Sequence, residues 1–183
     1  MKFLVLSGNP KEDGLCAGLE QALLSGAQAA GAETELLRLP KLSACRVCGD
    51  GWGICREEHK CVIQDDGFNE LSDKIAEFDA LAIVTPVYWA EVSETMKAFF
   101  DRFRRCNFFS GRLAGKTAII AASPGGTGNG LVTALQQIER FCQHNGVVVF
   151  DIIGQNRWSA PYKQAAAFEA AKSLCSGTEC WRP

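Results

Sequence analysis

Four cysteines stand within a stretch of seventeen residues in this chain, in the pattern Cys45-x2-Cys48-x6-Cys55-x5-Cys61. Thiolates are soft ligands, and four of them at short spacing suit an iron-sulfur cluster or a tetrahedral metal ion. Zinc sites built from two cysteine pairs usually separate the pairs by a dozen or more residues, so the six-residue gap fits them poorly. The pattern leaves three interpretations open: a cluster, zinc, or free or disulfide-linked thiols.

The other metal-ligating residues have simpler interpretations. His59 lies between the third and fourth motif cysteines and is either an alternative ligand or a solvated loop residue. Cys106 and Cys142 fall in helical patterns, which indicates small core residues. Cys175 and Cys180 are treated as incidental. Because no export signal is evident, the nine cysteines of the chain are expected to stay reduced, which favours metal or redox chemistry.

A second group of candidate residues lies in the segment 7–14. Gly8 and Gly14 permit tight turns, Ser7 and Asn9 offer hydrogen bonds, and Lys11 supplies a positive charge. The free N–H groups at the start of the helix that follows make this loop a candidate phosphate site. The loop matches neither the Walker pattern nor G-x-G-x-x-G, and small polar residues are also ordinary in strand-to-helix turns.

Two further loops carry residues suited to a flat ligand. In the segment 85–89, Tyr88 and Trp89 can stack on a ring or lie at its edge, or instead cap the core or form a dimer surface. The segment 123–130 holds four glycines in eight residues, which lets backbone donors approach a planar ring with polar edges.

The apolar periodicity predicts the elements that must position these loops. Continuous or alternating apolar runs predict five strands, the third of them stopped by Thr85-Pro86, and stripes at helical spacing predict five helices. Strict alternation implies a parallel sheet with helices on both faces, and ligands then bind beyond the carboxyl ends of the strands. We expect a single domain over 1–183 with a Cys-rich insertion at 41–64. The expected strands are 3–6, 33–39, 80–84, 117–121 and 147–153, and the helical stripes are 15–27, 68–78, 92–103, 131–141 and 161–174.

Three of these features together resemble a known family. They are Gly8-Asn9-Pro10-Lys11, Pro86-Val87-Tyr88-Trp89 with the helix that follows it, and the glycine-rich third loop. Over roughly residues 1–155 the chain resembles the flavodoxin-like NAD(P)H-dependent FMN reductases, and among them the iron-sulfur flavoproteins. The resemblance implies a three-layer sandwich around a five-stranded parallel sheet of order 2-1-3-4-5. It also implies that Cys45, Cys48, Cys55 and Cys61 hold a [4Fe-4S] cluster.

The resemblance further assigns the three loops to FMN. The first loop would grip the phosphate, the second would lie along the isoalloxazine ring, and the third would close over the ring. Where the family usually has Ser, Arg and Asn-Thr in the phosphate loop, this chain has Asn9, Lys11 and Leu15-Cys16, and its second and third motif cysteines stand farther apart. The residues assigned to FMN are Ser7, Gly8, Asn9, Lys11, Gly14, Leu15, Cys16, Pro86, Val87, Tyr88, Trp89, Ser123, Gly125, Gly126 and Gly128.

The function implied is an FMN-dependent oxidoreductase that takes hydride from NAD(P)H and passes electrons to a small molecule. The flavin carries the chemistry, so no catalytic acid or base is assigned beyond a weak proton-donor candidate, Tyr88. Two alternatives stay open: an electron carrier of the flavodoxin type, and a thiol or metal redox sensor. Electron carriers of that type tend to be strongly acidic, so the net charge of -2 argues modestly against the first alternative.

Composition excludes other classes of function. Nineteen basic and 21 acidic residues give no excess of positive charge for nucleic acid. The longest uncharged run, 117–138, is interrupted by the glycine-rich loop, so no membrane-spanning helix is expected, and the apolar run 3–6 is too short for a secretory signal. We therefore expect a cytoplasmic protein. The aromatic pair in the second loop predicts a homodimer or higher homo-oligomer that completes each flavin pocket.

Overall fold

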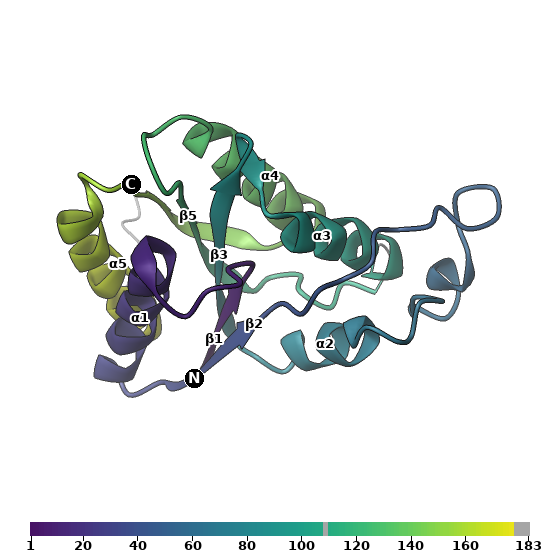
Figure 1. Ribbon diagram of the computed structural model, residues 1–183. Coiled ribbons are helices and arrows are strands. Elements are labelled where there is room, and N and C mark those ends of the chain that lie inside the picture. Colours follow the sequence, from purple (N-terminus) through teal and green to yellow (C-terminus); the bar gives the residue numbers. More distant parts are fainter. Residues whose placement is uncertain (108–109, 178–183) are drawn as a thin grey trace.

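Five parallel strands form the centre of the computed structural model, which describes residues 1–107 and 110–177 (Figure 1). Their order is β2-β1-β3-β5-β6. The register places Ser7, Val84, Ala121 and Ile153 in one row, so the loops that follow the strands leave from the same edge of the sheet. The strands are β1 (Lys2–Ser7), β2 (Glu33–Arg38), β3 (Ala80–Tyr88), β5 (Thr117–Ser123) and β6 (Val148–Gly154).

Helices cover both faces of the sheet (Figure 1). One face carries α1 (Gly14–Ala29) and α5 (Ala160–Cys175), which pack on each other. The opposite face carries α2 (Phe68–Ile75), α3 (Glu94–Asn107) and α4 (Leu131–His144). No helix within the described residues is long and apolar enough to cross a membrane.

The strand sequences explain the two layers of core. Successive side chains of a strand point to opposite faces. Phe3 and Val5 therefore pack beneath α1 and α5, and Leu4 and Leu6 beneath the other helices. Helices α1 and α5 approach each other so closely at Gly26 that a side chain does not fit there. A Cβ at this position would lie 2.1 Å from the backbone oxygen of Phe168 on α5.

The predicted strand order is confirmed. A short extra strand, β4, follows the third strand, so the fourth and fifth predicted strands are numbered β5 and β6. The two-residue strand β4 (Glu91–Val92) pairs antiparallel with the end of β3. The predicted stop of the third strand at Thr85-Pro86 is wrong, because β3 continues beside β5 and then into this hairpin. Trp89 and Ala90 form its two-residue corner with φ of 51° and 68°, the left-handed geometry that tight hairpins require.

The cysteine motif lies in the connection between β2 and α2, which leaves the sheet and runs out beside α3 (Figure 1). The regular structure of this connection is one turn of 3-10 helix, Ile54–Arg56, which contacts α3.

Candidate functional site

The first and second loops are joined by hydrogen bonds at the carboxyl edge of the sheet. The backbone N–H of Gly8 donates to the oxygen of Val84 at 2.9 Å. The hydroxyl of Ser93, just before α3, donates to the oxygen of Gly8 at 2.9 Å, and the N–H of Ser93 donates to Thr85 Oγ1 at 3.1 Å. Ser93 and Thr85 thus fix the second loop against the first.

The third loop packs on the second, and a glutamine ties it to the first. A Cβ on Gly130 would lie 2.3 Å from the Cα of Ala90, so the loop approaches the hairpin too closely for a side chain. The buried Gln155, which follows β6, donates from Nε2 to the oxygen of Leu15 at 2.6 Å and to Ser123 Oγ at 3.1 Å. The structure therefore brings the three predicted loops together at one place.

The side chains of Ser7 and Asn9 point into the protein. Both donate to the buried carboxylate of Glu20, at 2.5 Å from Ser7 Oγ and 3.1 Å from Asn9 Nδ2, and Arg38 donates to the other oxygen of Glu20 at 2.8 Å. Asn9 also bonds both backbone groups of Lys11. Their role in the structure is to shape the loop, which leaves ligand contact to backbone groups and Lys11.

Sequence reasoning missed Glu20 and Arg38. The available signal was a carboxylate on the apolar stripe of α1, between Leu19 and Leu23, because a charge in that position requires buried partners.

The start of α1 is open to an anion. Asp13, the N-cap residue, makes no side-chain hydrogen bond to the helix. The N–H groups of the first turn are thus left without the usual side-chain cap, and the helix dipole favours negative charge there. Lys11 is exposed in the loop that precedes the helix, as are the acidic Glu12 and Asp13. Gly14, Leu15 and Cys16 supply the backbone of this turn, which fits a phosphate group.

The second and third loops offer open surface for a ring. Trp89 is 99% exposed, a large apolar area for one side chain to leave in water. The pKa of Tyr88 is raised by burial and further by the nearby charges of Glu94 and Cys16. A Cβ on Gly125 or Gly126 would meet nothing within 4 Å, which leaves space beside their backbone.

The remaining residues assigned to the ring stand at the same edge. Pro86 and Val87 belong to the end of β3, Ser123 ends β5, and Gly128 lies opposite the amide of Asn156.

The four motif cysteines line one small cavity together with a fifth thiol, Cys106 of α3. Among the described residues no three His, Cys, Asp or Glu side chains stand close enough together to hold a single metal ion. A [4Fe-4S] cubane places one thiolate on each of four iron atoms, so its ligands stand farther apart than those around one ion. The donor set at this cavity is made of soft thiols, the ligands that iron-sulfur clusters use.

The cysteines other than Cys180, which lies outside the described residues, are free thiols. His59 does not line the cavity. Its Nδ1 lies 2.9 Å from the backbone oxygen of Cys106, and because a carbonyl only accepts, this nitrogen carries the proton. His59 thus fastens the insertion to α3.

Arg102 holds both ends of the insertion and was not anticipated from the sequence. Its guanidinium is fully buried over the ring of Phe68 and donates to the oxygens of Ser43 and Ile63, at 3.2 and 3.1 Å. It also pairs with Asp66. Burial alone would raise the pKa of this carboxyl, but bonds from Arg102 and two backbone N–H groups lower it below its ordinary value.

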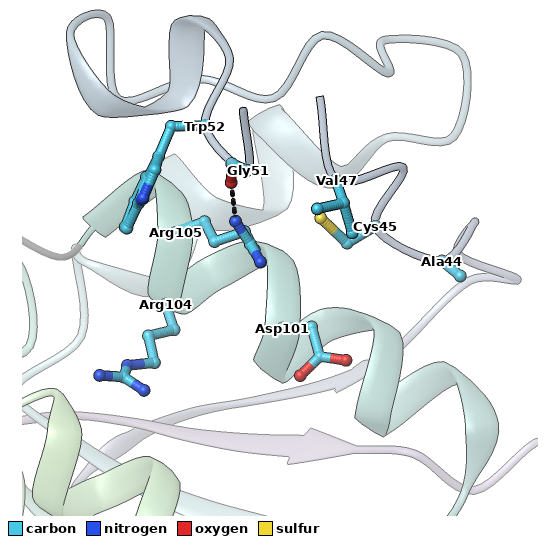
Figure 2. Close-up of a pocket in the computed structure, with 8 residues that line it drawn as sticks. All are labelled: Ala44, Cys45, Val47, Gly51, Trp52, Asp101, Arg104 and Arg105. Atoms are coloured by element: carbon cyan, nitrogen blue, oxygen red, sulfur yellow. Dashed lines mark hydrogen bonds between the residues drawn. The ribbon is translucent and has the colours of Figure 1, made fainter. Parts of the chain in front are cut away.

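A hollow of about 620 Å³ lies next to the thiol cavity and shares part of its lining (Figure 2). Cys45, Gly51 and Arg105 line both spaces. The guanidinium of Arg105 donates to the oxygen of Gly51 and lies 5.5 Å from the ring centre of Trp52. Two arginines, Arg104 and Arg105, and one acidic residue, Asp101, line this hollow.

Comparison with known proteins points to one family. The sequence model of the family described as NADPH-dependent FMN reductase matches residues 1–157. An iron-sulfur flavoprotein of Methanocaldococcus jannaschii is 32% identical over 166 residues, which are 88% of this chain and 80% of that protein. Another, from Methanosarcina thermophila, is 29% identical over 194 residues, with 98% and 96% covered.

A solved flavone reductase shares the fold. It superposes with a TM-score of 0.75 at 18% identity, and the alignment covers 97% of this chain but 62% of that one.

Proposed function

This chain belongs to the NADPH-dependent FMN reductase family, and from that premise we propose that it oxidises NADPH or NADH and delivers the electrons to a small-molecule acceptor. The observation that carries the proposal is the meeting of three loops at one sheet edge, with an uncapped helix N-terminus at one end and open glycine backbone at the other. A phosphate and a flat ring joined by a short chain match that layout.

The residues divide between holding the phosphate and holding the ring. Lys11 and the N–H groups of the first turn of α1 bind the phosphate, where charge and dipole act in the same direction. The hairpin of Tyr88 and Trp89 lies along the ring, and the backbone at 123–128 donates to its polar edge. Bound FMN accepts hydride and releases electrons singly or in pairs. The protein orients the ring and limits the access of water to it.

We further propose that a [4Fe-4S] cluster is held by Cys45, Cys48, Cys55 and Cys61. The support is their shared cavity, together with the names of the curated relatives. Arg102 and Arg105 line the same cavity, so their positive charge would lie beside a bound anionic cluster. When bound, a cluster of this type stores and transfers single electrons.

The exposed hairpin supports a homo-oligomer. The apolar surface of the fully exposed Trp89 is hydrated at a cost in free energy. Packing against a second copy of the chain would remove that surface from water. Sedimentation at micromolar concentration tests this: a mass of two or more chains is expected, and the mass of one chain would contradict it.

The decisive test of function is a spectrum followed by turnover. Anaerobically purified protein is expected to show flavin bands at roughly 375 and 450 nm and to oxidise NADPH in the presence of a quinone. Iron and acid-labile sulfide assays test the cluster separately. A colourless protein that does not take up added FMN would refute the flavin proposal. Flavin reduction by a protein donor without NAD(P)H turnover would indicate an electron carrier instead.

A further inference from the structure

The hollow beside the thiol cavity has the size of a small-molecule site. Its volume is about 620 Å³, within the range of roughly 300–1,000 Å³ that ligand pockets occupy. Helix α3 lines it with Asp101, Arg104 and Arg105, and the cysteine insertion supplies the other lining residues (Figure 2). None of these residues belongs to the three loops assigned to the flavin, so the proposed flavin site does not account for the hollow.

The charged side chains that line the hollow are mainly cationic. Asp101 is the acidic one, and the ammonium of Lys97, one turn earlier on α3, donates to both of its carboxylate oxygens, at 2.6 and 2.5 Å. Arg104 and Arg105 stand beside this neutralised pair, and Arg105 is held in place because it donates to the backbone oxygen of Gly51. Guanidinium groups stay charged and present planar donors that match the oxygens of an anion. The hollow therefore favours a negatively charged group.

Apolar surface lies next to these cations. Trp52 comes from the insertion, and the guanidinium of Arg105 lies 5.5 Å from its ring centre. Val47 is 55% exposed and Ala44 is exposed as well, so part of the lining is apolar surface left in water. An indole and a guanidinium both present flat faces on which an aromatic ring can stack. The hollow thus offers a place for a ring beside the place for the charge.

We propose that this hollow binds a small planar aromatic anion, a ring compound that carries a carboxylate, sulfonate or phosphate group. The ring packs against Trp52 and Val47, and the anionic group accepts hydrogen bonds from Arg104. Cys45 belongs to the walls of both the hollow and the thiol cavity, so the bound compound lies beside the cysteine motif. The inference uses neither the flavin nor a metal, and its test does not depend on the proposed function.

The test is isothermal titration calorimetry of the full chain with three probes, in the absence and in the presence of excess FMN. Naphthalene-2-sulfonate carries both the ring and the charge, and it is expected to bind with the same affinity in both conditions. Two probes that lack one of these features, 2-naphthol without the charge and inorganic sulfate without the ring, are expected to bind at least about tenfold more weakly. Competition by FMN would place the sulfonate in the flavin loops and would overturn the proposal.

Two variants separate the recognition of charge from that of the ring. Arg104→Gln should weaken binding of naphthalene-2-sulfonate about tenfold and leave that of 2-naphthol unchanged, whereas Trp52→Leu should weaken both about three- to tenfold. The matched controls are Arg140→Gln and Trp158→Leu, because both residues are exposed and neither lines the hollow. Circular dichroism checks that every variant folds. The proposal is wrong if the wild type does not bind the sulfonate, if Arg104→Gln weakens both probes equally, or if the controls lose as much affinity.

Discussion

The buried carboxylate of Glu20 provides the sharpest test of how the first loop is shaped. In Glu20→Gln the bonds from Ser7 and Asn9 change from charged to neutral. Hydrogen bonds to charged groups contribute roughly 1.5–3 kcal/mol and neutral ones roughly 0.5–1.5, so each bond loses about 1 kcal/mol. The ion pair with Arg38 adds about 1 kcal/mol, discounted because Arg38 is 29% exposed.

Together these losses predict that Glu20→Gln lowers the free energy of unfolding by about 2–4 kcal/mol. Urea unfolding at pH 7, followed by circular dichroism, measures the change. The matched control is Glu12→Gln, because Glu12 lies 3.8 Å from the same arginine but is 91% exposed. We expect the control to stay within about 0.5 kcal/mol of the wild type.

The FMN affinity of the same variants separates loop shape from direct contact. Glu20→Gln is expected to weaken FMN binding because Ser7 and Asn9 no longer fix the loop. If Glu20→Gln unfolds at the same urea concentration as Glu12→Gln, the network does not stabilise the loop and the reasoning is refuted. Weakened FMN binding without any loss of stability would instead place Glu20 in contact with the ligand.

Three further predictions follow from single contacts. The pKa of Asp66 is lowered in the fold, so its contribution to the free energy of unfolding is present above the ordinary pKa of 3.8 and is lost as the pH falls through the folded value. The difference in stability between the wild type and Asp66→Asn should be constant above about pH 5 and shrink below it. A difference that widens in acid would contradict this. Gly26→Ala should cost about 1–3 kcal/mol in thermal unfolding, because the added carbon meets the backbone of Phe168; an unchanged melting temperature would show that α1 and α5 separate freely. Gly125→Ala should leave stability within about 0.5 kcal/mol but weaken FMN binding measured by flavin fluorescence, and equal affinity would remove this glycine from the ring site.

The order of elements could be predicted from the sequence because it depends on local periodicity. The end of β3 could not, since Pro86 is a strong local stop signal and the continuation depends on pairing with Ser123 and with β4. Pairing partners of this kind are far apart in the chain and leave no periodic mark. The loops were correctly placed at one edge because parallel strands align their carboxyl ends.

The candidate site was predictable in its loops but not in its supporting side chains. Ser7 and Asn9 are polar residues in a loop, and the sequence around them does not indicate that they bind Glu20 on the next helix. Arg102 stands between Phe99 and Phe103 on the stripe of α3, and its partner Asp66 is 36 residues away. Cys106 was interpreted as core for the same reason: its helical spacing is correct, but the loop that packs over it is not periodic.

Helix α3 joins the loops at the sheet edge to the cysteine insertion. Before its first turn, the hydroxyl of Ser93 donates to the backbone oxygen of Gly8 and its N–H donates to Thr85 Oγ1, which joins the helix to the loops at the sheet edge. At its other end Arg102 fastens the insertion at Ser43 and Ile63, and between these points Val47 and His59 have positive φ, a conformation that side chains other than glycine adopt at a cost. The loops at the sheet edge are therefore fixed by hydrogen bonds within the protein, and the cysteine insertion is fastened to α3 at both of its ends. Both regions contain residues with positive φ, Trp89 and Ala90 in the first and Val47 and His59 in the second.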